Sequence, residues 1–214
     1  MRLFRSESAS PRPVMPMAMN DERVARHSSA LGEFARHIAG REALCILDLG
    51  PTSPQNIQYL TGLGHKLYTE DVLRASFDPS FRVSNDDGQP AISPELYLTE
   101  NLNYPEDKFD AALCWDIPDY MPESLVKPMV DRIRHILKPG GVVLAFFHTR
   151  DAGPDAPYYR YHIIGKDNLE LQSTRRFRLQ RVFNNRQTEN LFKEFSSLKF
   201  FLARDHIREM LVIR

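Results

Sequence analysis

The chain has 214 residues, 42% of them hydrophobic and 26% charged, a composition typical of a globular protein that can bury a full core. Basic and acidic residues both number 28, so no net charge favours binding to nucleic acid, and that class of partner is not expected. Two cysteines without metal-ligand spacing indicate no metal site, and no apolar run reaches the ~20 residues of a membrane span, which together favour a cytoplasmic protein.

The N-terminal segment predicts a tail followed by a helix. Residues 1–19 contain three prolines among serines and methionines, which predicts a flexible tail before a single domain over residues 20–214. Asn20 can cap a helix that ends at Gly40. The apolar positions of this helix form one face: Val24, Leu31, Phe34 and Ile38.

The next segment has the pattern of a strand, a turn and a helix. Residues 44–49 are almost continuously apolar, as in a parallel strand that is buried on both faces. Gly50 ends this strand, and Ser53 is a suitable helix cap. A second strand over 67–69 is expected to end at two acidic residues, Glu70 and Asp71.

The middle of the chain is less regular. Residues 72–94 predict an irregular segment with a turn at Asp86-Asp87-Gly88. Strands are predicted over 95–98, 109–115 and 142–148, with a helix over about 123–137 before the last of them.

The C-terminal part predicts hairpins. The expected elements are a hairpin of 159–164 with 169–172, a strand over 177–183, a helix over 188–195, and a final antiparallel pair of 199–203 with 209–213. The alternation of strands and helices predicts an α/β fold of the Rossmann-like, doubly wound type. Its mostly parallel, seven-stranded sheet would end in the antiparallel C-terminal hairpin.

The segment Arg175–Arg186 contains five arginines. Two interpretations stay open for it: a solvated face of an edge strand, or a site for an anionic ligand.

Two motifs resemble those of the class I S-adenosylmethionine-dependent methyltransferases. Ile46-Leu47-Asp48-Leu49-Gly50 is similar to the family's first, glycine-rich motif, although Thr52 and Pro54 replace its second and third glycines. Leu137-Lys138-Pro139-Gly140-Gly141 is similar to the family's turn before the fifth strand. The similarity spans about residues 20–214.

The resemblance implies S-adenosylmethionine as the cofactor. It implies cofactor contacts from residues at the ends of the first four strands: Asp48, Gly50, Thr52, Ser53, Glu70, Asp71, Thr99 and Trp115. Asp71, or else Glu70, would accept hydrogen bonds from the ribose. His148 and Asp116 are the candidate catalytic residues, since both follow strands at the expected active edge.

Two functions remain open at this point. The first is a methyltransferase that acts on a small-molecule, glycan or lipid-precursor acceptor. The second is a non-catalytic methyltransferase-like module, with a binding or regulatory role, that has lost the cofactor. The replaced glycines favour the second function, whereas Asp48, Gly50 and Asp71 favour the first.

Overall fold

The computed structural model describes residues 22–84, 88–149, 152–153, 156–174, 177–201 and 205–214. The predicted tail over 1–19, the Asn20 cap and most of the turn at 86–88 lie outside the described residues.

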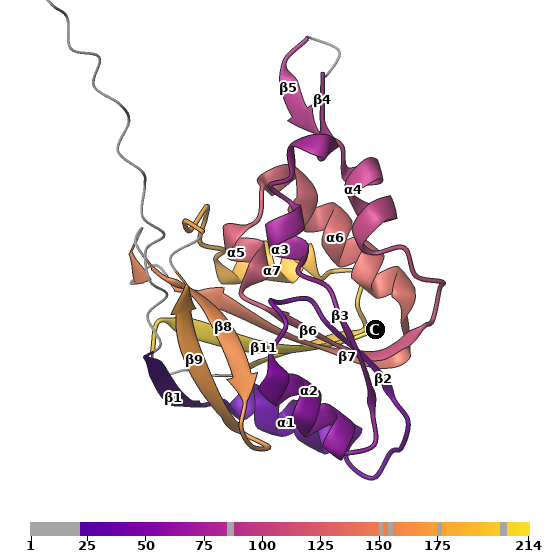
Figure 1. The fold of residues 1–214 in the computed structure, drawn as a ribbon, viewed down its shortest axis with the longest axis vertical. Coiled ribbons are helices and arrows are strands. Elements are labelled where there is room, and N and C mark those ends of the chain that lie inside the picture. The colour runs from indigo at the N-terminus through magenta and orange to yellow at the C-terminus, as the bar shows by residue number, and fades with distance from the viewer. Residues whose placement is uncertain (1–21, 85–87, 150–151, 154–155, 175–176, 202–204) are drawn as a thin grey trace, which may run out of the picture.

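A mixed sheet of six strands forms the centre of the molecule, in the order β10-β11-β7-β6-β2-β3 (Figure 1). Its strands are β2 (Cys45–Asp48), β3 (Lys66–Thr69), β6 (Phe109–Trp115), β7 (Leu137–His148), β10 (Ser197–Phe201) and β11 (Ile207–Ile213). Strands β3, β2, β6 and β7 are parallel, and β11 pairs antiparallel with both β7 and β10. The predicted C-terminal hairpin is therefore confirmed.

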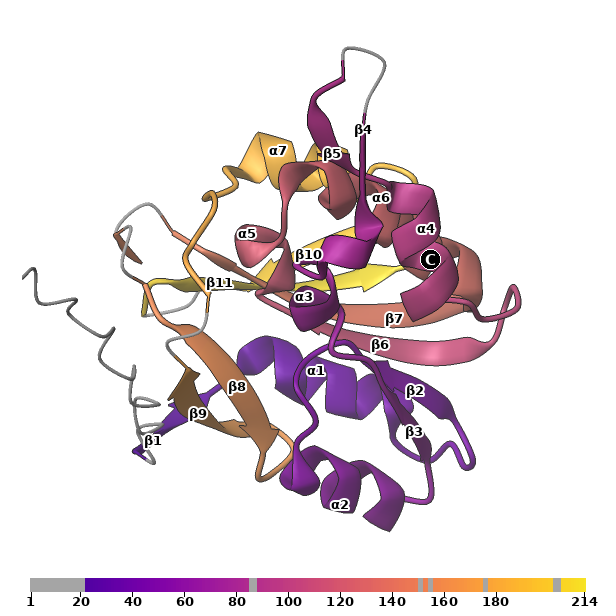
Figure 2. The same cartoon turned by 45° about the horizontal axis from the view of Figure 1, so that its top comes forward.

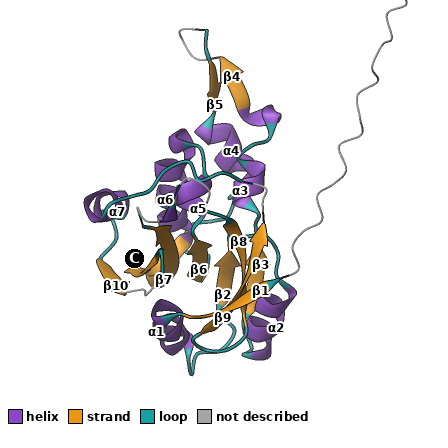
Figure 3. Ribbon diagram, turned by 90° about the vertical axis from the view of Figure 1, so that its left-hand side faces the viewer, coloured by secondary structure: helices purple, strands orange, loops and turns teal. Residues whose placement is uncertain are grey.

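Helices cover both faces of this sheet (Figure 3). One face carries α1 (Ser29–Ile38) and α2 (Pro54–Gly62). The other carries α3 (Val72–Ala75), α4 (Pro94–Asn101), α5 (Ile117–Tyr120), α6 (Glu123–Ile136) and α7 (Asn185–Leu191). Because side chains alternate along a strand, Leu113 of β6 packs with the α1 core and Cys114 with the α6 core.

A second, smaller sheet lies across the carboxyl ends of the parallel strands (Figure 2). It has the order β1-β9-β8 and consists of β1 (Arg23–His27), β8 (Tyr158–Ile163) and β9 (Asn168–Thr174). All its pairings are antiparallel. The predicted hairpin over 159–172 is thus present, but it belongs to this sheet and not to the central one.

The prediction of a strand over 95–98 is wrong. These residues lie in α4. The Ser93 side chain caps this helix by accepting a hydrogen bond from the Leu96 N–H, and Pro94 is in the first turn. Ser-Pro is a helix start, because proline has no N–H to leave unpaired there. The central sheet consequently has six strands among the described residues, where seven were predicted.

Other boundaries also differ from the predictions. The helix expected from Asn20 begins only at Ser29, since Ser28 is the cap and β1 precedes it. Residues 177–183 do not form a strand. The segment 72–94 is more regular than expected, and contains α3, a 3-10 turn at Pro79–Phe81, and a hairpin of β4 (Arg82–Ser84) with β5 (Pro90–Ile92).

The Leu-Lys-Pro-Gly-Gly turn forms an irregularity at the start of β7. The pairing with β6 shifts between Leu137 and Val142. A Cβ on Gly141 would lie 2.7 Å from Leu137 Cγ, so only glycine fits this close turn. None of the helices in the described part of the chain is long and apolar enough to cross a membrane.

Candidate functional site

Asp48 lies buried at the end of β2, where its side chain organises the turn that follows. Its Oδ1 accepts hydrogen bonds from the Gly50 N–H at 3.1 Å and from Trp115 Nε1 at 2.7 Å. Its Oδ2 accepts one from Asn56 Nδ2 at 2.8 Å. Burial raises the pKa of Asp48 to about 6, although these three donors favour its charged form. Both oxygens of the Asp48 carboxylate therefore have hydrogen-bond partners within the protein.

The indole of Trp115 covers Gly50. A Cβ on Gly50 would lie 2.8 Å from Trp115 Cδ1, so this position accepts only glycine while the indole is there. Trp115 has a φ of 51°, in the left-handed region that non-glycine residues seldom adopt. Its ring stacks on Tyr161 of β8, with a centroid distance of 4.9 Å and an interplanar angle of 4°. The backbone of Gly50 is thus closed to a ligand on this side.

A network of buried hydrogen bonds fixes the β8–β9 hairpin to the start of α2. Ser53 caps α2 and also hydrogen-bonds His162 Nδ1 at 2.8 Å. Asn56 donates from Nδ2 to the Tyr161 carbonyl and accepts the Ile163 N–H on Oδ1 at 2.7 Å. The Ser53 side chain therefore joins the start of α2 to the hairpin. Sequence reasoning missed Asn56, because nothing near it in the sequence indicates a partner more than 100 positions away.

A cavity of about 540 Å³ opens beside this network, and we call it the edge cavity. Its lining comes from the β2–α2 loop, the start of α3, the hairpin and the segment after it: Pro51, Thr52, Asp71, Arg74, Phe77, Tyr158, Arg160, Thr174 and Phe177. Its size falls within the range of ligand pockets. A cavity of about 400 Å³ elsewhere involves α1 and α2, away from the carboxyl ends of the strands.

The two acidic residues after β3 have different environments. Asp71 lines the edge cavity and caps α3 by accepting the Arg74 N–H on Oδ1 at 3.2 Å. Glu70 does not line the cavity and accepts a hydrogen bond from the Tyr104 hydroxyl. Thr99 is exposed on α4, because the strand expected there is a helix. Thr99 is therefore not among the residues that the structure brings to this edge.

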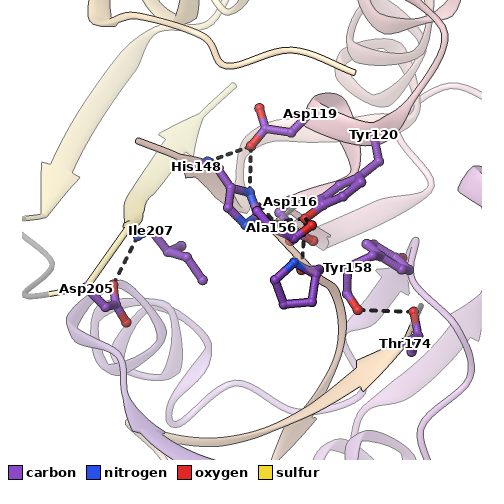
Figure 4. Close-up of polar contacts among 10 residues, drawn as sticks. Asp116, Asp119, Tyr120, His148, Ala156, Tyr158, Thr174, Asp205 and Ile207 are labelled. Carbon is purple, nitrogen blue, oxygen red and sulfur yellow. Dashed lines mark hydrogen bonds and ion pairs between the residues drawn. The ribbon is translucent and has the colours of Figure 1, made fainter. Parts of the chain in front are cut away.

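Four titratable side chains meet at the carboxyl ends of β6 and β7 (Figure 4). Asp119 Oδ2 accepts the backbone N–H of His148 at 2.5 Å and lies 3.1 Å from His148 Nδ1. Asp116 Oδ2 lies 3.9 Å from the same nitrogen. On the other side of the ring, the Tyr120 hydroxyl is 3.4 Å from His148 Nε2. The structure thus brings both candidate catalytic residues into one cluster.

Several polar atoms of this cluster have no hydrogen-bond partner. Among the described residues, they include Asp119 Oδ1 and the hydroxyl of Tyr158. The Asp116 carboxylate and the Tyr161 hydroxyl interact with each other, but not within normal hydrogen-bond geometry. Buried polar groups are nearly always paired in folded proteins. Unpaired atoms gathered at one place therefore point to a bound molecule or ordered water that would complete them.

The surroundings shift the pKa values of the cluster. Burial raises the pKa of Asp116 to about 7. Burial alone would lower the pKa of His148, but hydrogen bonding to Asp119 and the charge of Asp116 outweigh it, so its pKa is raised above the usual value. Shifts of this kind mark candidate proton-transfer groups.

A smaller cavity of about 280 Å³ adjoins His148, and we call it the His148 cavity. It lies between β1, the hairpin and β11, and has mainly apolar walls. Its lining is Val24, Ala25, Arg26, His148, Ala152, Ala156, Pro157, Tyr159, Leu171, Asp205, His206 and Ile207. Arg26 is fixed there by Asp205 at 2.6 Å and Glu209 at 2.5 Å.

No protein-family model matches the sequence, and no curated protein matches it. Solved structures do match. An S-adenosylmethionine-dependent methyltransferase from Archaeoglobus fulgidus is 9% identical, with a TM-score of 0.50 and coverage of 86% of this chain and 91% of that one. The chain has a methyltransferase fold. That is the fold which the two sequence motifs predict.

Two further solved structures that the chain resembles are also named as methyltransferases. One is the Burkholderia thailandensis 1,6-didemethyltoxoflavin-N1-methyltransferase with bound S-adenosylhomocysteine, at 15% identity, TM-score 0.49 and coverage of 87% and 79%. The other is an S-adenosylmethionine-dependent methyltransferase from Aquifex aeolicus, at 11% identity, TM-score 0.47 and coverage of 86% and 88%.

The residues at the active edge of this methyltransferase fold suit an adenosyl ligand in the edge cavity. Asp71 places a carboxylate in the lining, and the stacked rings of Phe77 and Phe177 form an aromatic wall. The surface of Gly50 does not suit a ligand, because Trp115 occupies it. The open space of the cavity lies beside Thr52, whereas the surface of Gly50 is covered.

Proposed function

We propose that this chain binds S-adenosylmethionine in the edge cavity and transfers its methyl group to a small-molecule acceptor. The observation that carries the proposal is the position of Asp71, which follows the second parallel strand and lines a cavity together with the loop after the first. A carboxylate at this place can accept hydrogen bonds from both ribose hydroxyls. When bound, the cofactor supplies a methyl group on a positively charged sulfur.

The acceptor would enter through the His148 cavity, which shares no lining residue with the edge cavity. It would therefore have to meet the methyl group at Tyr120, which packs on Tyr158 of the edge cavity and lies against His148. The volume of the His148 cavity, about 280 Å³, favours a small molecule over a glycan or lipid chain. His148 would accept the proton that a hydroxyl or amine acceptor loses. Asp119 is a positioning residue, because its hydrogen bond to Nδ1 favours the tautomer whose Nε2, next to the Tyr120 hydroxyl, carries no proton.

A non-catalytic binding module is the second candidate function. It is favoured by one observation, the Trp115 indole on the surface of Gly50. The hydrogen bond from this indole to Asp48 and its stacking on Tyr161 both hold it in place. If the indole also excludes ligand from the edge cavity, the fold would serve in binding another partner.

Titration calorimetry with S-adenosylmethionine and S-adenosylhomocysteine tests the proposal. We expect dissociation constants in the micromolar range for the wild-type chain, and a loss of ~10-fold or more in Asp71→Asn, since one hydrogen-bonded charge is removed. Asparagine caps helices as well as aspartate, so α3 should remain intact. Glu70→Gln is the matched control, because Glu70 is the neighbouring acidic residue and does not line the edge cavity.

Unchanged affinity in Asp71→Asn would overturn the ribose assignment. Absence of binding at millimolar concentrations of both ligands would reject the methyltransferase proposal in favour of the non-catalytic module. Thr52→Gly provides a second probe, because a large gain in affinity would identify the loop side chain as the obstacle.

A further inference from the structure

Arg160 enters the edge cavity from strand β8. Side chains alternate along a strand, so Tyr158, Arg160 and His162 share one face of β8. His162 on this face is hydrogen-bonded to Ser53, at the start of α2. Arg160 therefore lies next to the preceding loop residues, and both it and Thr52 line the cavity.

The guanidinium of Arg160 has unused hydrogen-bonding capacity. Its Nε is buried and has no hydrogen-bond partner. Across the part of the chain that the structure describes, neither Arg160 nor Arg74, the second arginine of the cavity, makes an ion pair. Arginine is suited to carboxylates because its planar N–H groups can bind both oxygens at once.

The charged side chains of the cavity are suited to two different kinds of ligand group. Asp71 is the single acidic residue in its described lining, against the two arginines. A ligand with hydroxyls at one end and an anionic group at the other would satisfy both. The hydroxyl of Tyr158, a residue only 1% exposed, is also unpaired and adds a further donor on the hairpin wall.

Trp115 restricts where the anionic group can lie. The indole fills the space against Gly50, so an amino-acid end cannot rest on that part of the loop. The positively charged donors in the cavity are the guanidinium groups of Arg74 and Arg160. We propose that Arg160, assisted by Arg74, binds the carboxylate of the amino-acid end of an adenosyl ligand. This inference rests on the proposed function, and it assigns the anchoring of the amino-acid end to the hairpin in place of the glycine-rich turn.

A pair of ligands isolates this contact. S-adenosylhomocysteine has the amino-acid end, whereas 5′-methylthioadenosine has the same nucleoside and sulfur without it. We expect the wild-type chain to bind the first at least ~10-fold more tightly in calorimetry, as for a charge-assisted contact. In Arg160→Gln this preference should fall to about twofold or less, through weaker binding of S-adenosylhomocysteine alone.

Binding of 5′-methylthioadenosine also reports whether each variant keeps a folded cavity. Arg74→Gln should reduce the preference by a smaller factor, since Arg74 is exposed. Arg178→Gln is the matched control, because Arg178 is an exposed arginine in the segment after the hairpin that does not line the cavity. It should leave both affinities unchanged.

The outcomes separate this inference from the proposed function. Equal affinity of the wild-type chain for the two ligands, or an undiminished preference in Arg160→Gln, would overturn the inference and leave adenosyl binding in place. Binding of neither ligand would overturn both.

Discussion

Two buried carboxylates at the active edge differ in what surrounds them. Asp48 receives three hydrogen bonds from protein donors, and burial raises its pKa to about 6. Asp116 has no hydrogen bond of normal geometry and only a looser contact with the Tyr161 hydroxyl, and burial raises its pKa to about 7. A carboxyl group that is already saturated holds its neighbours in place, while one with free capacity can bind a ligand or carry a proton. Asp116 is therefore the better candidate for chemistry.

The Asp119–His148 contact has a measurable consequence for the imidazole. The hydrogen bond to Asp119 raises the pKa of His148 against the opposing effect of burial. In Asp119→Asn the imidazolium loses a charged partner, so the pKa of His148 should fall by about 1 unit or more. Histidine-selective NMR titration measures this shift without requiring the acceptor to be known.

His162 is the internal control for that titration. It is buried like His148, but its partners are Ser53 and Gln172, so its pKa should not move in Asp119→Asn. An unchanged pKa at His148 would show that Asp119 does not control this imidazole.

Sequence reasoning at the residue scale succeeded where the signal is local. The Ser53 cap followed by Pro54 is readable because a cap and its helix are adjacent in the chain. The environment of Trp115 was not predictable, since its stacking partner Tyr161 is brought to it by the hairpin. The assignment of Thr99 failed because the element that carries it was misjudged.

The β8–β9 hairpin depends on Asn56 for its attachment to α2. This one side chain bonds Asp48, the Tyr161 carbonyl and the Ile163 N–H, and it is 1% exposed. Asn56→Ala should lower the free energy of unfolding by about 2–4 kcal/mol, because it leaves buried groups without partners. Urea denaturation measures the loss, and hydrogen exchange should show faster exchange of the hairpin amides.

Asn101→Ala is the matched control for that substitution. The side chain of Asn101 makes one hydrogen bond within the described residues, from Nδ2 to the Tyr97 carbonyl at 2.8 Å, and it is only partly buried. Its removal should cost about 1 kcal/mol or less. Equal losses in the two variants would contradict a special role for Asn56.

At the element scale, the errors share a physical origin. The apolar residues over 95–98 fit a short strand or a helix equally, and the Ser93-Pro94 start decides for the helix. β1 forms because β9 offers it a partner, more than 140 residues later in the chain. The strongly apolar strands β2, β6 and β7 were predictable, because burial on both faces leaves a continuous signature.

In the described part of the chain, most of the buried polar atoms without a hydrogen-bond partner lie at one edge of the molecule. The two helical layers pack on the sheet through apolar side chains, while unpaired carboxylate and hydroxyl oxygens lie at the carboxyl ends of β6 and β7 and on the hairpin above them. Such groups reduce stability unless a ligand completes them. Unpaired buried polar groups that lower the stability of the folded state are typical of ligand-binding sites.

Stability should therefore fall as the pH rises through the range in which the buried acids ionise. The pKa of Asp116 rises from 3.8 to about 7 in the folded state, so the folded chain holds this proton more tightly than the unfolded chain. The stabilising contribution is complete below pH 4 and is lost as the pH approaches 7. Between pH 5 and pH 8 the wild-type chain should lose about 2–3 kcal/mol more than Asp116→Asn does.

Urea denaturation of both proteins at the two pH values measures this difference. Asp131→Asn is the control, because Asp131 is a half-exposed carboxylate on α6 and its removal should change stability by a similar amount at both pH values. Parallel pH dependence of the wild-type chain and Asp116→Asn would mean that Asp116 ionises in the folded state near its ordinary pKa. Its two oxygens would then be solvated or paired, and they would no longer indicate a ligand site at this edge.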